Sequence, residues 1–452
     1  MRFCAPRDWR RCVASTQPNP ALLPGGWRPV LSSITASPSA AGGIGVAANP
    51  CGSGSGTSQT DELITGNGTF LPRDVFAHTA CVYHGKVFVF GGRHAQSHSA
   101  RLDVLDLSSD PLVWSQPSTH GTTPLPRRQH TAALDSSGRM HIIGGGCNEA
   151  GERLYRAGMH SLDLETFTWE VRPSLPGGWA CMAHSCLSVP EGSIPPHDRE
   201  DATHGAESHS SLWSRGDSLI VFGGLTTKWQ EFTMPGNAEP IWVEQPVVND
   251  SLLRFDVSAD EWTALHPSGI APSGRFRHSA TLLPAHSAMV VWGGFLVTLQ
   301  NGADGQPIPG WDETCANELF LLHLPSLSWS VPRLSGNSPA PRGGHSAVLV
   351  GEHLLLLGGC DGGEDDGGDG AESFIERDLS DFHTLDTRSW AYHPVTPAGR
   401  DLPVRSGHTT ALVPWDGGVG VLILGGRDYR APERPFQDGE HLGRSDAYLL
   451  LL

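Results

Sequence analysis

The chain has 452 residues and a formal net charge of −17, because 48 acidic side chains outnumber 31 lysines and arginines. This negative charge argues against nonspecific binding to nucleic acid or to an anionic membrane, so we expect neither as a partner. The 55 glycines and 35 prolines favour short strands joined by turns, which indicates an all-β fold.

Residues 1–58 differ in composition from the rest of the chain. They contain five arginines, no lysine and a single acid, Asp8, together with many small residues. They lack the apolar segment of a secretory signal, but an organellar transit peptide and a disordered leader both remain open. We therefore expect a leader ending in a flexible Gly/Ser linker over residues 1–58, and one folded domain over residues 59–452.

Nine cysteines are scattered along the chain without a CxxC motif. This pattern indicates reduced, mostly buried thiols rather than a disulfide framework. We expect a cytoplasmic or nuclear protein, with an organellar location as the alternative if residues 1–58 are a transit peptide.

From residue 78 onward, one pattern recurs six times. Each unit opens with a histidine at the start of a strand, at His78, His130, His184, His278, His345 and His408. A second, apolar strand then ends in two glycines, at Gly91-Gly92, Gly144-Gly145, Gly223-Gly224, Gly293-Gly294, Gly358-Gly359 and Gly425-Gly426. A third strand follows, and a fourth opens with Trp114, Trp169, Trp262, Trp329 or Trp390 in the first five units.

An apolar run of four residues is too short for a helix and suits a strand that is buried on both faces. The glycine pair allows positive φ or a close backbone approach where the strand ends. Four antiparallel strands in each of six units describe the blades of a β-propeller.

The order of histidine strand, double glycine and spaced tryptophan resembles the kelch repeat. This resemblance covers about residues 59–452 and implies an all-β, six-bladed kelch-like β-propeller with four antiparallel strands per blade. A WD40 propeller is the competing interpretation, but no repeat tryptophan is followed by aspartate.

The sixth unit ends on its third strand, so we expect an N-terminal strand to close the ring and protect the open edge. Two segments qualify as the closing strand. Residues 27–30 contain Trp27 but lie far upstream of His78, whereas residues 60–65 lack a tryptophan but have the repeat spacing. We favour residues 60–65.

Long loops and arginines are expected on one face of this propeller. The extra length falls mostly between strands two and three, at 225–250, 295–317, 360–380 and 427–445. The turns between strands four and one open on the same face. Six arginines follow glycine pairs or precede histidines there, namely Arg93, Arg127, Arg275, Arg342, Arg405 and Arg427.

These arginines have two interpretations. They either bind a partner, because a guanidinium group suits a carboxylate or a phosphate, or they pair with backbone carbonyls and acids between blades. The first interpretation predicts a protein or peptide partner with an acidic or phosphorylated segment. We expect the six histidines to be structural.

Signals for metal binding or catalysis are weak. The acidic loop 361–372 resembles a calcium loop only at its ends, and His197, His204 and His209 do not have the spacing of a metal site. Phosphate-loop, nucleophile-elbow and zinc-helix motifs are missing from the sequence. We expect no catalytic residue, no metal and no cofactor.

The favoured function is therefore a protein-interaction module or scaffold that binds a peptide or protein loop on the arginine-bearing face. The alternatives are a metal-dependent propeller enzyme and, from the family resemblance, a substrate receptor that works with a separate ubiquitin-ligase adaptor.

Overall fold

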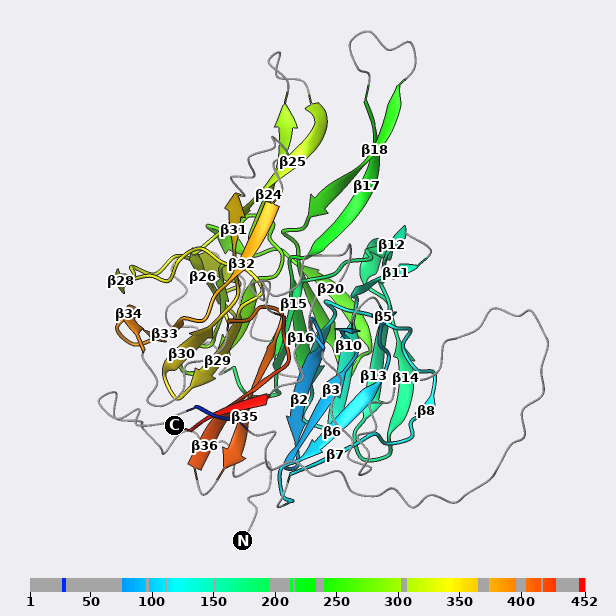
Figure 1. Cartoon of the computed structure of the whole chain (residues 1–452), viewed down its shortest axis with the longest axis vertical. Coiled ribbons are helices and arrows are strands. Elements are labelled where there is room, and N and C mark those ends of the chain that lie inside the picture. The colour runs from blue at the N-terminus through cyan, green and yellow to red at the C-terminus, as the bar shows by residue number, and fades with distance from the viewer. Residues whose placement is uncertain are drawn as a thin grey trace, which may run out of the picture.

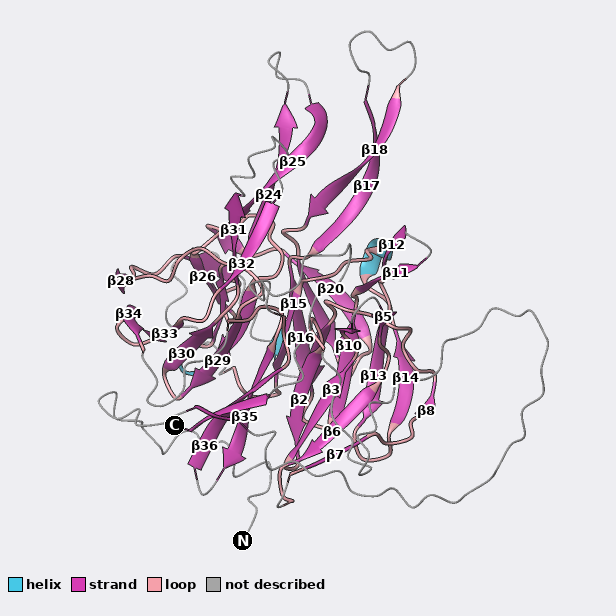
Figure 2. Ribbon diagram, viewed as in Figure 1, coloured by secondary structure: helices cyan, strands magenta, loops and turns pink. Residues whose placement is uncertain are grey.

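The computed structural model describes the chain at residues 27–29, 75–94, 97–109, 112–149, 152–194, 212–213, 216–232, 240–301, 307–364, 374–395, 404–415, 418–427 and 447–451. The regular structure is almost entirely β-strand (Figure 2). Six blades of four antiparallel strands surround a central axis, with further hairpins at their edges (Figure 1). The prediction of a six-bladed propeller is confirmed.

The strands of each blade run outward from the axis in chain order, because each histidine strand contacts the histidine strands of both neighbouring blades. The first blade contains β2 (Thr79–Tyr83), β3 (Lys86–Phe90), β6 (Leu102–Asp106) and β7 (Val113–Ser115). The second contains β9 (Thr131–Leu134), β10 (Arg139–Ile143), β13 (Met159–Asp163) and β14 (Thr168–Arg172). The third contains β15 (Ser185–Val189), β16 (Ser218–Phe222), β19 (Leu252–Asp256) and β20 (Glu261–Leu265).

The next two blades repeat this arrangement. The fourth contains β22 (Ser279–Leu283), β23 (Ala288–Trp292), β26 (Leu319–His323) and β27 (Ser328–Ser330). The fifth contains β29 (Ser346–Val350), β30 (His353–Leu357), β33 (Phe382–Asp386) and β34 (Ala391–Pro394). Three two-residue strands add a parallel edge to β14, β27 and β34, namely β8 (His120–Gly121), β21 (Ser268–Gly269) and β28 (Ser335–Gly336).

The sixth blade combines the two ends of the chain. It contains β35 (Thr409–Trp415), β36 (Gly418–Leu424), β37 (Ala447–Leu451) and β1 (Trp27–Pro29). Trp27 pairs with Leu450 and Pro29 with Tyr448, in antiparallel register. The prediction of N-terminal closure is confirmed, but our choice of segment was wrong. Residues 27–29 take the outer position that we assigned to 60–65, and 60–65 lie outside the described residues.

The blades are held together by apolar clusters between neighbouring sheets. Phe88 and Phe90 of the first blade, for example, pack with Met140, Ile142 and Trp169 of the second. Similar clusters join every other pair of neighbours, including the sixth blade with the first. Burial of the apolar middle strands on both faces explains why their sequences do not alternate.

Four of the five predicted tryptophans lie on the outer strand where expected, and the fifth blade differs. Trp169 pairs with Leu162 on the neighbouring strand, and Tyr392 occupies the same place opposite Leu385. Tyr392 is buried and accepts a hydrogen bond from Trp292 Nε1 at 2.9 Å. Trp390, which we placed at the start of this strand, lies just before it with a positive φ of 54°.

Each glycine pair fits between two histidines of neighbouring blades. A Cβ on Gly91 would lie 2.7 Å from His130 Cε1, and one on Gly92 would lie 2.8 Å from His78 Cβ. Both glycines also have positive φ, at 69° and 92°. A larger residue at either position therefore meets both a steric and a conformational penalty.

Three of the four predicted long loops, 225–250, 295–317 and 360–380, contain hairpins that project from one face together with two shorter hairpins, while residues 428–445 of the fourth lie outside the described residues (Figure 1). Their strands are β4 (Arg93–His94) with β5 (Ser97–His98), β11 (Gly146–Glu149) with β12 (Glu152–Tyr155), β17 (Leu225–Phe232) with β18 (Ile241–Val248), β24 (Phe295–Asn301) with β25 (Pro307–Cys315), and β31 (Cys360–Glu364) with β32 (Phe374–Asp378). These hairpins surround the end of the axis where the glycine pairs lie.

Candidate ligand-binding site

A closed ring of backbone hydrogen bonds surrounds the central axis. Its members directly precede the six histidines, and all have φ between 52° and 63°. Each donates its N–H to the carbonyl of the preceding blade's member at 2.7 to 2.9 Å. In chain order the members of this hub ring are Ala77, Gln129, Ala183, Arg277, Gly344 and Gly407. The ring closes because Ala77 donates to Gly407.

The six histidines form a second ring, directly outside the hub ring. Each Nε2 shares a hydrogen bond of 2.8 to 3.0 Å with the hydroxyl of the Ser or Thr that opens the preceding blade's first strand. All six are buried. Burial lowers the pKa of His78 and His184 to about 4 and that of His345 and His408 to about 3. The histidines therefore act as neutral links between blades.

Four of the six predicted arginines are held inside the blades, where Arg127, Arg275, Arg342 and Arg405 are at most 2% exposed. In each, Nη1 donates to the carbonyl of the first glycine of its blade's pair, at 2.8 to 3.0 Å. Glu318 accepts from Arg275, and Asp381 accepts from Arg342. These contacts match the second interpretation, in which the arginines bond backbone carbonyls and acids.

The charge of Asp381 reflects this contact. Burial by itself raises the pKa of Asp381, but hydrogen bonds and charge from Arg342 and His383 lower it well below the usual range. Asp381 is thus a carboxylate that satisfies a buried guanidinium group.

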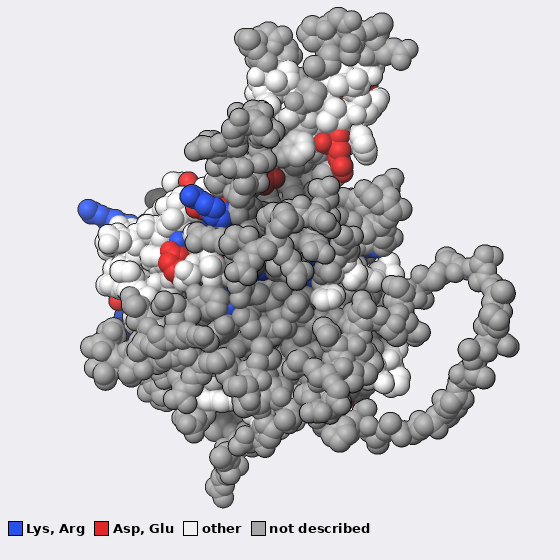
Figure 3. All heavy atoms as spheres, in the orientation of Figure 1, with Lys and Arg blue, Asp and Glu red and all other residues white. Residues whose placement is uncertain are grey.

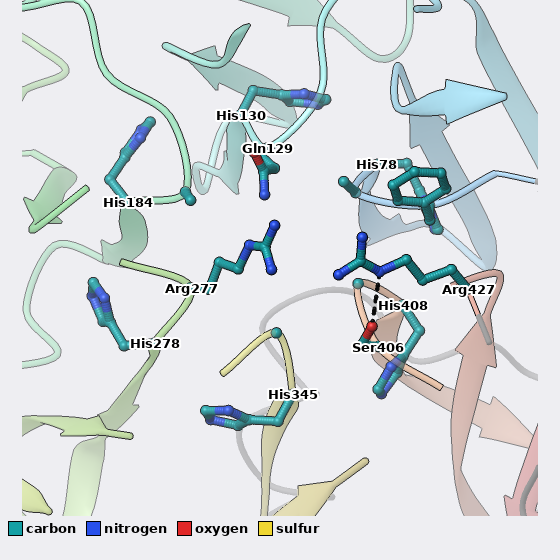
Figure 4. A pocket seen from close by; sticks show the side chains of 15 residues that line it. His78, Gln129, His130, His184, Arg277, His278, His345, Ser406, His408 and Arg427 are labelled. Carbon is teal, nitrogen blue, oxygen red and sulfur yellow. Dashed lines mark hydrogen bonds between the residues drawn. The ribbon is translucent and has the colours of Figure 1, made fainter. Parts of the chain in front are cut away.

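A cavity of about 140 Å³ lies on the axis at the hub ring. Its described lining contains all six hub-ring residues and all six histidines, together with Phe76, Ser406 and Arg427. No aspartate or glutamate occurs among these lining residues. Figure 4 shows Arg277 and Arg427 pointing into the cavity from opposite sides.

Both guanidinium groups are held by neighbours of the cavity. Arg427 Nε donates to Ser406 Oγ at 3.1 Å, and its Cζ lies 5.6 Å from the centre of the Phe76 ring. Arg277 Nε donates to the side-chain oxygen of Gln129 at 2.9 Å when that amide is oriented to satisfy both groups. Arg277 also lies over Phe295, at 5.6 Å. Two guanidinium groups, which carry only hydrogen-bond donors, therefore converge on this cavity.

The remaining predicted arginine, Arg93, lies beside this cavity. It is partly exposed, and its Cζ lies 6.0 Å from the Phe76 ring, which also contacts Arg427. Arg93 and Arg427 therefore lie near each other at the first and sixth blades.

Sequence reasoning missed Arg277 and Gln129. Both occupy the position before the repeat histidine, where the other units have Ala or Gly. A long polar side chain at a position otherwise restricted to small residues is a signal that could have identified them.

Other chemistry finds little support among the described residues. They contain no group of three or more His, Cys, Asp or Glu side chains that could hold a metal. His197, His204 and His209 and most of the acidic loop lie outside the described residues, while Asp361 pairs with Arg377 at 3.0 Å. In the described part of the chain, no helix is long and apolar enough to cross a membrane.

A Ser–His–Asp chain in the second blade is structural. His141 contacts Ser161 Oγ at 2.7 Å through Nδ1 and Asp135 at 2.9 Å through Nε2. All three side chains are buried, and Arg172 also donates to Ser161. None of them lines the axial cavity.

Comparisons with known proteins agree with the propeller fold. The family profile described as the KLHDC2/KLHL20/DRC7 Kelch-repeats domain matches residues 57–194 and 242–439. The chain belongs to the kelch-repeat family. Kelch domain-containing protein 3 of Bos taurus is 23% identical over 325 residues, which are 71% of this chain and 70% of that protein.

Further relatives share parts of the kelch propeller. Acyl-CoA-binding domain-containing protein 4 of Arabidopsis thaliana is 28% identical over 273 residues, or 55% of this chain and 37% of that protein. The chain thus spans less than half of this relative. The solved structure of YjhT has a TM-score of 0.52 at 15% identity, covering 84% of this chain and 95% of that one. This likeness concerns the fold alone.

Membership of the kelch-repeat family is compatible with a protein-interaction role. The expectation that it has no enzymatic activity stays a prediction, as does its location in the cell.

Proposed function

We propose that this kelch propeller is a protein-interaction module that binds an acidic or phosphorylated segment of a partner at its axial cavity. The observation that carries the proposal is the convergence of Arg277 and Arg427 on one axial cavity. A carboxylate or phosphate group would accept hydrogen bonds from both guanidinium groups. A cavity of about 140 Å³ suits the end of one side chain rather than a whole peptide.

The surrounding hairpins and Arg93 would contact the rest of the segment. Of the six arginines singled out in the sequence, only Arg93 and Arg427 belong to this proposed site, and Arg277 joins them. Each of the other four donates a hydrogen bond to a backbone carbonyl inside its own blade.

The test replaces each cavity arginine by a residue that other blades already have at the same position. Arg277→Gly matches Gly344 and Gly407, and Arg427→Leu matches Leu225, which follows the third glycine pair. We expect each change to weaken binding of a phosphoserine or glutamate peptide about tenfold or more, because a hydrogen bond to a charged group contributes roughly 1.5–3 kcal/mol. Isothermal titration calorimetry on the full chain measures this.

The matched control is Arg388→Ala, in the turn between β33 and β34 on the opposite face. Peptides with serine or glutamine in place of the anionic residue should bind weakly to all variants. Unchanged affinity in both cavity variants, or an equal loss in the control variant, would contradict the proposal.

A further inference from the structure

The hairpins of the third and fourth blades carry an unusual concentration of exposed apolar side chains. Ten large hydrophobic residues are exposed in the described chain, and six of them lie on these two hairpins: Trp229, Ile241, Trp242, Leu299, Ile308 and Trp311. Trp229 is 65% exposed and Trp242 is 60% exposed. Exposed clusters of this kind mark interaction sites more often than isolated apolar residues do.

A short sequence pattern recurs on these hairpins. Each of the three tryptophans is followed two residues later by glutamate, in Trp229-Gln-Glu231, Trp242-Val-Glu244 and Trp311-Asp-Glu313. Residues two apart in a strand point to the same face. Each tryptophan therefore has a carboxylate beside it on its own strand.

Strand pairing places two of these motifs on one surface. Trp229 pairs directly with Glu244, and Glu231 pairs directly with Trp242. Directly opposite side chains of an antiparallel pair share a face. The four side chains therefore alternate in a square, with the two tryptophans on one diagonal and the two glutamates on the other.

The other face of this hairpin holds two buried side chains. They are Phe232, which is 6% exposed, and Gln245, which is 1% exposed. β18 also contacts both strands of the neighbouring hairpin, β24 and β25. Figure 3 shows acidic side chains among uncharged ones on the projecting part of the molecule.

We infer that the square formed by Trp229, Glu231, Trp242 and Glu244 is a docking surface for an arginine-bearing segment of a partner protein. A purely apolar partner would leave both carboxylates desolvated without a counter-charge. An arginine can bind both the indoles and the carboxylates of the square. Its planar guanidinium group stacks on an indole, and its forked N–H donors fit a carboxylate. The only described basic residue of this hairpin, Lys228, is directed to the opposite face.

This surface differs from the axial cavity in both its place and its charge. The cavity presents arginines to an anion, while the square presents carboxylates and indoles to a cation. Glu244 is held in place because it accepts a hydrogen bond from Thr227 Oγ1.

The experiment measures binding of a labelled peptide with arginine at alternate positions to the full chain, by fluorescence anisotropy. The paired double variants are Trp229→Ala with Trp242→Ala, and Glu231→Gln with Glu244→Gln. We expect each double variant to weaken binding about tenfold or more, and Lys228→Ala to leave it unchanged. Added salt should weaken binding to the parent chain more than to the glutamine variant.

Several results would overturn the inference. A citrulline peptide that binds as tightly as the arginine peptide would show that charge plays no part. Unchanged affinity in both double variants would show that the peptide does not bind at the square. If the double alanine variant unfolds, the double glutamine variant still provides this test. Self-association that the tryptophan variant abolishes would assign the surface to a second copy.

One further competitor lies within the chain itself. Residues 1–26 contain four of the five arginines of the N-terminal stretch. If deleting residues 1–26 strengthens peptide binding tenfold or more, the chain's own N-terminal stretch is the occupant, and the inference of a partner is wrong. Unchanged affinity after this deletion supports the partner.

Discussion

At the scale of residues, neighbouring arginines of one face have opposite roles. Arg275 is fully buried and donates to the carbonyl of Gly293, whereas Arg277, two residues later, is partly exposed and points into the axial cavity. The two side chains point in different directions although only two positions separate them, and Arg277 has a positive φ of 52°. The number of arginines on a face therefore says little about how many can meet a ligand.

This contrast predicts different effects on stability. Arg342→Met should lower the free energy of unfolding by roughly 2–4 kcal/mol, because the Gly358 carbonyl and Asp381 both lose their buried donor. Arg277→Gly should change it by less than about 1 kcal/mol, since glycine suits a φ of 52°. Urea unfolding followed by circular dichroism measures both. Equal losses in the two variants would refute the assignment of roles.

At the scale of elements, the three-residue strand β1 has an importance beyond its length. Without it, β37 would expose an unpaired edge in the sixth blade. The apolar cluster between the sixth and first blades, which includes Leu449, lies beside this seam. Ring closure thus depends on residues at the two ends of the chain.

Removing β1 therefore has a predictable outcome. Deletion of residues 1–29 should lower the thermal midpoint by several degrees and promote self-association, because the edge of β37 becomes available for pairing. Deletion of residues 1–22, which keeps the strand, is the matched control. Scanning calorimetry and light scattering measure the two effects. If both truncations behave alike, β1 does not close the ring in solution.

At the scale of the whole molecule, the hub combines two closed rings. The backbone ring and the histidine ring each pass through all six blades, so that a disturbance in one blade reaches its two neighbours. Burial keeps the pKa of all six histidines below the ordinary value of 6.5.

These lowered pKa values predict acid sensitivity. In the unfolded chain, His78, His184, His345 and His408 bind protons below pH 6.5, whereas their folded pKa values are about 3 to 4. The contribution of these histidines to the free energy of unfolding should therefore be fully present above pH 6.5. It should fall as the pH drops toward 4, because unfolding takes up protons in this window. Urea unfolding at several pH values measures the slope.

A single variant isolates one member of the histidine ring. His345→Gln keeps a side chain able to bond Ser279 but cannot titrate. It should reduce the proton uptake on unfolding by about one. Stability that stays constant from pH 7 to pH 5 in the parent chain would contradict the neutral histidine ring.

The sequence by itself was sufficient to predict the repeat, the number of blades and the face that carries the long loops. These follow from local rules: apolar runs of strand length, glycines that leave no room for a Cβ, and loop lengths counted between them. Even the structural role of the histidines could be inferred from their regular recurrence.

Tertiary structure alone decided which segment closes the ring and which side chains meet at the axis. Repeat spacing favoured residues 60–65, but the strand that pairs with β37 is Trp27–Pro29. A longer connection between two elements adds little to the entropic cost of loop closure, so the closing strand need not lie at the repeat spacing. The convergence of Arg277 and Arg427 joins the fourth and sixth blades, and the square of Trp229, Glu231, Trp242 and Glu244 depends on hairpin register. The first joins residues far apart in sequence, and the second needs a strand register that the Trp-x-Glu pattern does not specify.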